Sequence, residues 1–419
     1  MNKRWGIVAL IFTGILISYI DRTNLSIANT AIMQTFGLSP SAMGTLLSAF
    51  FWTYAIFQLP AGFVVDRFGV RGTYAAAFFI WSIASASMAL SRGYGDFLAL
   101  RLVLGFAETV GPLASLAYIR RNFAGPEQGL PTSIYIAGQT FGPAIGALLG
   151  SALLVHFGWR FMFGATGLVA LLWVPVWLYV LPKKDSKLPA AARPVKKKLN
   201  IRWGPVLGDL GFWAMSACVF FLSYYWYFVL TWMPAYLSMT RGFSTMQMGA
   251  IFSAPMFLMA GVNIFAGWWA DRLAKATGNV FGIRLRFACG GLIGSSAILL
   301  LNFLPGSGAV LPVLVVSICS FGIASSSFWT ISQHAPPGDL VGRTIGYLNT
   351  LSQLAGVAAP LITGWSLGPQ KNFTVAIALA GISTLIAAAL LMLTGSKGLN
   401  RLKTNLNYLP AESGALEYS

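Results

Sequence analysis

Charged residues are scarce in this sequence: 9% of its 419 residues are Asp, Glu, Lys or Arg, against 56% that are apolar. So low a fraction of charged residues, together with a mean hydropathy of +0.70, excludes an ordinary soluble domain. The cysteines, Cys218, Cys289 and Cys319, form no CxxC or Cys/His cluster, so we expect no metal and no disulfide framework. The chain also lacks HExxH and GxxxxGK(S/T), which argues against a metallohydrolase and ATP-driven transport. We expect no enzyme and no cofactor.

What the sequence has instead is a series of long apolar segments. A membrane-spanning helix needs about 20 predominantly apolar residues. Twelve segments meet this requirement, at residues 5–33, 41–65, 73–91, 95–119, 129–155, 161–181, 209–237, 245–270, 284–303, 309–333, 341–367 and 373–394. The sequence therefore predicts an all-α membrane protein with twelve transmembrane helices. Because the loops between them are short, its function must lie within the helix bundle.

A basic, proline-containing interval at residues 182–206 divides the spans into six and six, as a cytoplasmic linker would. We expect an N-terminal half at 1–181, a C-terminal half at 207–396 and a cytoplasmic tail at 397–419. An internal repeat supports this division. The segment GFVVDRFGVR begins at Gly62, and GWWADRLAKATG begins 205 residues later at Gly267. Corresponding polar turns in two six-helix halves indicate a pair of pseudo-symmetric repeats.

The net charge of +17 is distributed unevenly along the chain. If the N-terminus is cytoplasmic and the spans alternate, 22 of the 28 basic residues fall on the cytoplasmic side and four on the outer side. This is the positive-inside bias of membrane proteins, and it places both termini in the cytoplasm. Basicity here orients the protein in a lipid bilayer and does not indicate a nucleic-acid partner. We expect a monomer in a bacterial cell inner membrane.

Four ionisable side chains interrupt the apolar segments: Asp21 and Arg22 in the first, and Arg101 and Glu108 in the fourth. A charge at membrane depth costs about 3 kcal/mol, so such groups usually face a partner or a substrate path. Arg101 and Glu108 share one helix face, about 10 Å apart along the axis. Burial favours the neutral form of a carboxylic acid, whereas a nearby arginine favours the ionised form, so an acid under both influences can bind and release a proton. An arginine that is freed from such an acid can bind an anion. The alternative is a static salt-bridge network.

The repeat carries a recognisable pattern. Gly62, Asp66, Arg67, Gly69 and Arg71 fill the sequence GxxxDRxGxR, which resembles the cytoplasmic-loop signature of the major facilitator superfamily. The second copy keeps Gly267, Asp271 and Arg272 and departs downstream. The resemblance implies a cytoplasmic gate formed by Gly62, Asp66, Arg67, Arg71, Asp271 and Arg272. A cluster of charges that only orients the chain in the membrane is the alternative.

The charged segments narrow the resemblance. YIDRTNLSIA, from Tyr19, and RLVLGFAE, from Arg101, are similar to the anion:cation symporter family, and most to bacterial galactonate-, glucarate- and hexuronate-type proton symporters. The similarity implies that Asp21 and Glu108 couple protons, that Arg101 pairs with these acids and that Arg22 binds the substrate carboxylate. Further substrate-contacting positions implied by it are Tyr54, Gln139, Trp329 and Asn349. Each of the four taken alone could instead form hydrogen bonds between helices.

The fifth apolar segment carries a competing pattern. Gly138, Gly142, Pro143 and Gly146 are close to the signature of drug–proton antiporters, although the four-residue spacing also suits close helix packing. An exporter of lipophilic cations would need acids in its cavity, whereas Arg22 and Arg101 favour anions. We therefore expect proton-coupled symport of an organic anion, such as an aldonate, aldarate or hexuronate. Export of drugs or metabolites is the alternative.

Overall fold

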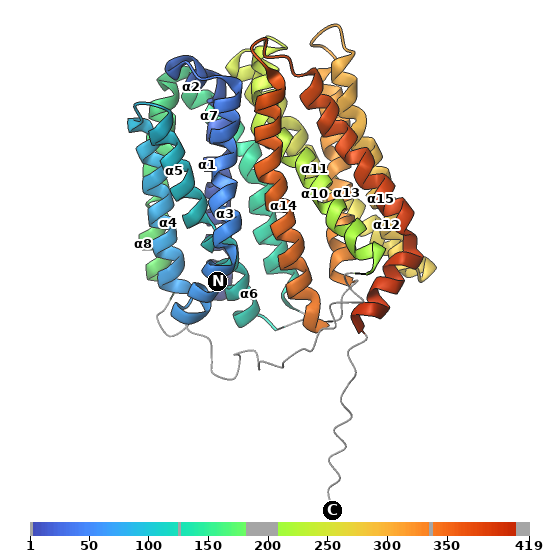
Figure 1. Ribbon diagram of the computed structural model, residues 1–419. Coiled ribbons are helices and arrows are strands. Elements are labelled where there is room, and N and C mark those ends of the chain that lie inside the picture. Colours follow the sequence, from blue (N-terminus) through green and yellow to red (C-terminus); the bar gives the residue numbers. More distant parts are fainter. Residues whose placement is uncertain (1–2, 125–126, 182–207, 335–337, 408–419) are drawn as a thin grey trace, which may run out of the picture.

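The computed structural model describes residues 3–124, 127–181, 208–334 and 338–407. The predicted linker at 182–206 and residues 408–419 of the predicted tail lie outside this part of the chain. The beginning of that tail continues the last helix as far as Asn407, after a break in helical geometry at Gly395. Helices make up nearly all of the described structure (Figure 1).

The N-terminal half consists of helices that cross the molecule alternately upwards and downwards in Figure 1. They are α1 (Lys3–Ile27), the short α2 (Asn29–Phe36), α3 (Pro40–Phe68), α4 (Val70–Ser87), α5 (Tyr94–Glu108), α6 (Val110–Asn122), α7 (Gly129–Ala170) and α8 (Trp173–Val180), with a 3-10 turn at Met88–Leu90. α5 and α6 follow one another with Thr109 between them and form one crossing.

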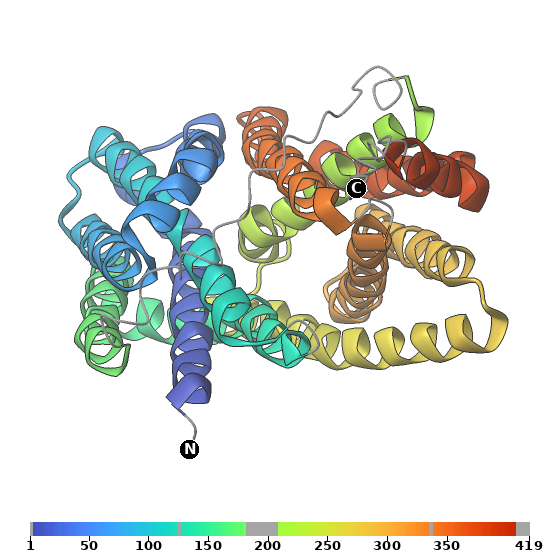
Figure 2. The ribbon, with the colours of Figure 1, turned by 90° about the horizontal axis from the view of Figure 1, so that it is seen from below.

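The C-terminal half repeats this pattern. They are α10 (Leu210–Met239), α11 (Thr245–Thr277), α12 (Val280–Ser295), α13 (Val310–His334), α14 (Gly338–Leu367) and α15 (Thr374–Asn407), with a 3-10 helix at Ser296–Asn302. Figure 2 shows the two halves side by side, seen from the side where α1 begins and α15 ends. We call this the terminal side, and the opposite one the far side.

The expectation of twelve spans is confirmed. Eleven stretches of the described chain are long and apolar enough to cross a membrane, and one of them, Gly129–Val180, contains two of the predicted spans. Its backbone leaves helical geometry at Gly158, where φ is 77° and ψ is 168°. Glycine adopts a positive φ without strain, so the chain can turn back here between the segments predicted at 129–155 and 161–181. Eleven stretches therefore make twelve crossings.

Local sequence signals fix several helix ends. Ser39 caps α3 by accepting a hydrogen bond from the backbone N–H of Ala42 at 3.2 Å. Ser244 and Gln247 form a reciprocal capping box at the start of α11. Between α3 and α4, Gly69 has a φ of 84°, which suits glycine and permits the sharp turn of the first repeated motif.

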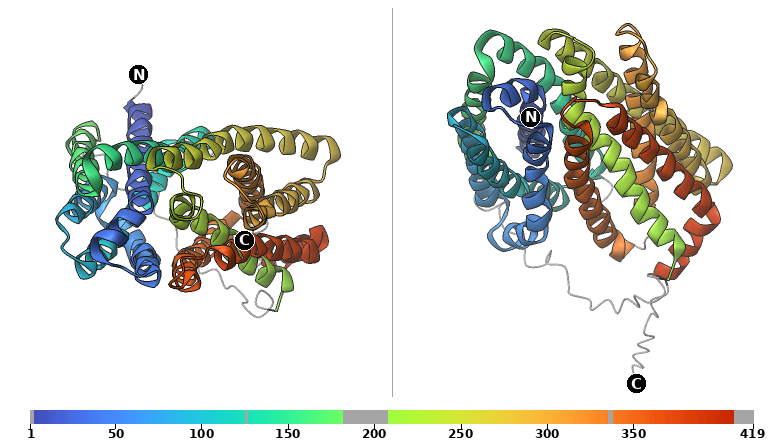
Figure 3. Two further views of the ribbon diagram at one scale, coloured as in Figure 1. Left: turned by 90° about the horizontal axis from the view of Figure 1, so that it is seen from above. Right: turned by 45° about the horizontal axis from the view of Figure 1, so that its top comes forward.

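The two halves meet closely on the far side. A Cβ atom at Gly44 of α3 would lie 2.6 Å from the Pro360 carbonyl oxygen of α14 and 3.1 Å from the Cα of Gly364. A second seam joins α7 to α11, where a Cβ at Gly249 would overlap the Ser151 side chain. Both seams lie near the far ends of their helices, which appear at the top of Figure 1 and face the viewer in the left view of Figure 3. The far side is therefore closed.

Candidate functional site

An ion pair between α1 and α5 lies inside the N-terminal half. Nε of Arg22 donates to Oε2 of Glu108 over 2.7 Å, and the Ser18 hydroxyl donates to the same oxygen over 2.6 Å. Ser18 and Arg22 are one turn apart on α1, so both reach one carboxylate. The Glu108 side chain is fully buried, whereas 15% of the Arg22 side chain is exposed. The pair thus joins a buried acid to a cation that solvent can reach.

Close packing of α5 against α3 brings Glu108 to this position. A Cβ atom at Gly105 would overlap the carbonyl oxygen of Phe50, so glycine is needed for the two helices to approach. The Thr53 hydroxyl donates to the Leu102 carbonyl oxygen across the same contact, over 2.7 Å. Arg101 and Glu108 are both buried, in agreement with the helix face that they were predicted to share, and Gly105 between them is buried as well.

Asp21 takes a different direction from its neighbour Arg22. It is 2% exposed, and its Oδ1 accepts a hydrogen bond from the Ser85 hydroxyl of α4 over 3.1 Å. Successive residues of a helix point about 100° apart, so Asp21 faces the interior of the N-terminal half while Arg22 faces elsewhere. Consecutive positions on a helix fix this angle, but they do not tell which neighbouring helix each side chain meets.

Arg101 has backbone partners rather than an acid in this conformation. Its Nε donates to the Leu46 carbonyl oxygen at 3.3 Å, and its Nη2 to that of Leu47 at 3.4 Å, both on α3. Phe50 lies between the two arginines: its ring centroid is 4.6 Å from the guanidinium carbon of Arg22 and 5.2 Å from that of Arg101. The negative face of the ring attracts a cation on either side. The implied pairing of Arg101 with Asp21 or Glu108 stays a prediction.

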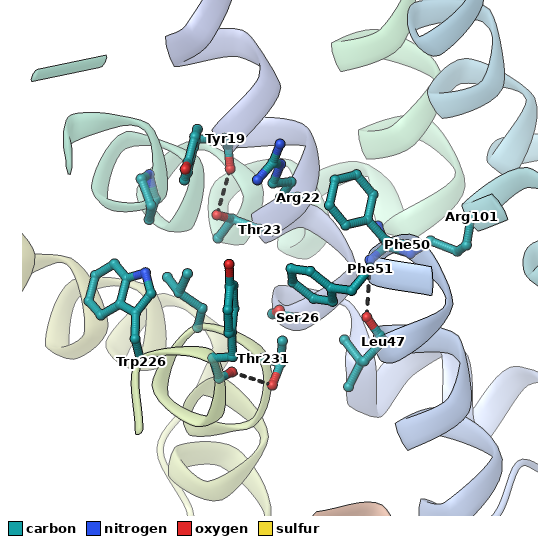
Figure 4. Close-up of a pocket in the computed structure, with 13 residues that line it drawn as sticks. Tyr19, Arg22, Thr23, Ser26, Leu47, Phe50, Phe51, Arg101, Trp226 and Thr231 are labelled. Atoms are coloured by element: carbon teal, nitrogen blue, oxygen red, sulfur yellow. Dashed lines mark hydrogen bonds between the residues drawn. The ribbon is translucent and has the colours of Figure 1, made fainter. Parts of the chain in front are cut away.

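A central cavity lies between the halves, with about 510 Å³ of space between protein atoms, counting the part that opens to solvent. Figure 4 shows its lining, to which both halves contribute. The described residues that line it are Tyr19, Arg22, Thr23, Ser26, Leu47, Phe50, Phe51, Arg101, Pro143, Trp226, Tyr227, Leu230 and Thr231. This set contains two arginines and no acid, together with hydroxyl groups and aromatic rings. Such a lining suits an anion that carries hydroxyl groups.

The four substrate positions implied by resemblance fall in different places. Tyr54 is buried beside the site, with its ring centroid 5.0 Å from the Arg22 guanidinium carbon. Gln139 donates to the Tyr135 hydroxyl over 2.8 Å, one turn away on α7. Trp329 and Asn349 are half-buried on α13 and α14, and the described residues that line the cavity do not include them. Their role in substrate binding stays a prediction.

Sequence reasoning missed the contribution of α10. Trp226, Tyr227 and Thr231 line the cavity from the C-terminal half, and the Tyr227 hydroxyl donates to Oε1 of Gln353 on α14 over 3.1 Å. The signal was the aromatic run at residues 224–228, but an aromatic belt at the membrane surface gives the same pattern. Tyr225, in the same run, bonds Ser317 at 2.5 Å and lies outside the cavity.

The repeated motifs lie at the terminal side, each beside an arginine outside the motif. Asp66 is 3.8 Å from Nη2 of Arg121 on α6, and Asp271 forms an ion pair with Arg284 on α12. Arg71 donates to the carbonyl oxygens of Leu178 and Leu181, both over 2.6 Å, so it fastens α4 to the end of α8.

The other motif residues lie at the surface of the protein or beside open space. Arg67 and Arg272 are exposed, and each guanidinium lies near an aromatic ring of its own helix, Phe68 and Trp268. A Cβ atom at Gly62 would meet open space. A gating role for all six predicted motif residues stays a prediction.

Comparison with known proteins agrees with this architecture. The sequence pattern of the Major Facilitator Superfamily matches residues 11–360. The chain is 27% identical over 417 residues to a protein named probable galactarate/D-glucarate transporter of Escherichia coli K12, covering 92% of each chain. It is 28% identical over 421 residues to a D-galactonate transporter of an Escherichia coli O6:H1 strain, covering 92% of this chain and 95% of the other.

The solved structures agree in fold. A bacterial homologue of the human lysosomal transporter Spinster, in an inward-facing and unoccupied conformation, superposes with a TM-score of 0.76 at 17% identity, covering 97% of this chain and 98% of the other. Twelve crossings in two halves, a charged cavity between them and a family match over most of the chain lead to one conclusion. The protein is a membrane transporter that belongs to the Major Facilitator Superfamily.

Proposed function

We propose that this transporter is a proton-coupled symporter that takes up a sugar acid, such as an aldonate, aldarate or hexuronate, across a bacterial inner membrane. The observation that carries the proposal is the central cavity, where two arginines and several hydroxyl groups face one space with no acid among the described lining residues. The names of the relatives, which mention galactarate, D-glucarate and D-galactonate, support the same class of substrate.

The ion pair supplies a means of coupling. Ionised Glu108 holds Arg22 through the 2.7 Å bond, and a substrate carboxylate must compete for the same guanidinium. Protonation removes the negative charge from Glu108 and frees the planar fork of Arg22 for the substrate, which it can bind through two hydrogen bonds. When the proton leaves Glu108, the internal pair re-forms and the substrate loses its partner. Proton and anion therefore bind together and leave together.

In this proposal Asp21 and Arg101 complete the exchange. Asp21 is buried and accepts a hydrogen bond from the Ser85 hydroxyl, and a buried carboxylate without a cationic partner is costly unless it is protonated. Arg101 rests on carbonyl oxygens, so it can leave them for a carboxylate without breaking another ion pair. Its position beside the cavity makes it a second cation available to the substrate or to an acid.

The distribution of the basic residues supports a cytoplasmic position for the terminal side. With the far side closed at the α3–α14 and α7–α11 seams, the cavity would then face inwards, the state from which an importer releases its substrate. The ion pairs of Asp66 and Asp271 lie on the cytoplasmic side, within each half, where they can hold helix ends during opening and closing.

The glycines of α7 do not favour the exporter alternative. A Cβ atom at Gly138 would lie 2.9 Å from the Phe12 carbonyl oxygen, and one at Gly146 would lie 3.1 Å from the Cα of Ile20. These glycines therefore serve the close packing of α7 on α1. The cavity beside them is lined by two arginines, with no acid among the described lining residues, which disfavours lipophilic cations.

Transport into proteoliposomes tests the proposal. An imposed inward proton gradient should accumulate labelled D-glucarate, galactarate or D-galactonate above its equilibrium level, and a proton ionophore should abolish the accumulation. A gradient that instead drives extrusion of a lipophilic cation would support the exporter. Absence of proton-driven movement of all three acids would contradict a sugar-acid symporter.

A further inference from the structure

We propose that Ser18 is a positioning residue for coupling, which holds the Glu108 carboxylate in place and favours its ionised form as the proton leaves and Arg22 returns from the substrate. This inference rests on the proposed function, since it assigns a residue to the same exchange. Neither the residue pattern nor the charges of the sequence singled out this serine. The contacts of Glu108 in the folded protein point to it.

The geometry gives Glu108 two donors on one oxygen. Arg22 and Ser18 both donate to Oε2, at 2.7 and 2.6 Å, and Ser18 itself is 3% exposed. Oε1 is buried and has no hydrogen-bond partner among the described residues. While a substrate occupies Arg22, Ser18 is therefore the donor to this carboxylate that remains among the described residues. Without that donor, an ionised Glu108 would be buried and unpartnered, which is strongly unfavourable.

The charged and titratable surroundings of Glu108 come from four helices. The groups that interact with it are Tyr19, Asp21 and Arg22 of α1, Tyr54 of α3, Tyr74 of α4 and Arg101 of its own α5. Replacing the Ser18 hydroxyl leaves all of these groups in the protein. Ser18 is neutral at every working pH, so a change in the pH dependence of transport after its replacement reports on the carboxylate that it contacts.

The consequence for coupling has a definite sign. A hydroxyl that donates to a carboxylate favours the ionised form. Loss of the hydroxyl should weaken the ionised form of Glu108 relative to its protonated form, so Arg22 should be free for substrate over a wider range of pH. Binding above neutral pH should then be tighter than in the wild type, because the internal competitor for Arg22 is weaker. Release of the proton on the cytoplasmic side should be slower, which lowers net uptake. Mere damage to the fold would not tighten binding.

The experiment compares Ser18→Ala with Ser18→Thr in purified protein and proteoliposomes. The probe is whichever of labelled D-glucarate, galactarate and D-galactonate binds the wild type most tightly. For Ser18→Ala we expect the midpoint of the binding-versus-pH curve to move up by about one pH unit. Proton-driven uptake should fall while counterflow exchange, which needs no net proton release, is retained. Ser18→Thr, which keeps the hydroxyl, should restore the wild-type curve.

Two further variants keep the test decisive. Ser87→Ala removes a half-buried hydroxyl from α4, outside the site, and should leave the curve unchanged. If Ser18→Ala does not fold, Ser18→Val can be compared with Ser18→Thr, because the two side chains have the same shape and differ by the hydroxyl. An unshifted curve in Ser18→Ala or Ser18→Val, with normal wild-type transport, would overturn the role of Ser18 alone. Wild-type protein that shows no proton-driven uptake of any of the three acids would overturn both proposals.

Discussion

The substitution Arg22→Lys tests the carboxylate-binding role of Arg22 most directly. Lysine keeps the positive charge but replaces a planar fork with a single ammonium group. Three rings surround the guanidinium, since the centroids of Tyr19, Phe50 and Tyr54 lie 4.7, 4.6 and 5.0 Å from its carbon. They hold its plane in a fixed orientation, which an ammonium group on a flexible chain cannot reproduce.

The expected magnitude follows from the bonds that are lost. One hydrogen bond to a charged group contributes about 1.5–3 kcal/mol, which corresponds to roughly 10- to 150-fold in Kd. The same substitution also weakens the competing bond to Glu108 at 2.7 Å, and this offsets part of the loss. The net expectation is therefore near the lower limit, about tenfold weaker binding. Arg22→Gln, which removes the charge as well, should weaken binding further.

The measurement is equilibrium binding of a labelled sugar acid to purified protein at a fixed pH. Arg160→Lys serves as the matched control, because Arg160 is exposed near the far side, donates to the Ala89 and Ser91 carbonyl oxygens and does not line the cavity. It should leave the Kd unchanged. If Arg22→Lys binds within twofold of the wild type, the carboxylate does not rest on the Arg22 fork, and the reasoning from the ion pair is wrong.

Three other changes have distinct expected results. Asp21→Asn should abolish proton-driven uptake and spare counterflow exchange; unchanged active uptake would remove Asp21 from coupling. Gly364→Ala would place a Cβ atom 2.5 Å from the Pro40 carbonyl oxygen, so it should open the α3–α14 seam. A cysteine introduced into the cavity by Ser26→Cys should then react faster with an impermeant thiol reagent that is added from outside. Gly290→Ala, whose Cβ meets open space, is its control, and equal rates would refute the seam's role. Tyr227→Phe should weaken sugar-acid binding about fivefold by removing one hydroxyl from the cavity, whereas Tyr225→Phe, outside it, should not; equal effects would argue against α10 as a substrate wall.

Much of the fold could be predicted from the sequence because membrane burial leaves a long, simple signal. Each span needs about 20 apolar residues, and loops are marked by polar and basic residues, so most ends of the predicted spans lie close to the observed ones. The largest differences are at the ends of the first span, predicted at residue 33 and observed at Ile27, and of the eighth, predicted at residue 270 and observed at Thr277. The turn at Gly158 also falls in the short gap between two predicted spans.

The site was only partly predictable. Asp21, Arg22, Arg101 and Glu108 stand out because charge is costly in a membrane, but spacing along one helix does not tell which neighbouring helix each side chain meets. The bond from Arg22 to Glu108 and the bond from Ser85 to Asp21 join residues far apart in sequence. Contacts of this kind depend on helix packing. For the same reason Ser18, an ordinary small residue in an apolar run, carried no signal.

Asp21 and Arg22 are consecutive residues whose side chains leave α1 in different directions. Asp21 points into the packed interior of the N-terminal half beside Ser85, and Arg22 points into the cavity. A proton bound at Asp21 and a sugar acid bound at Arg22 would therefore lie on different sides of α1, and neither would occupy the space of the other. Because α1 moves as one rigid body, a tilt or rotation of this helix displaces both side chains together. Such a motion would change the surroundings of the proton and of the substrate at the same time.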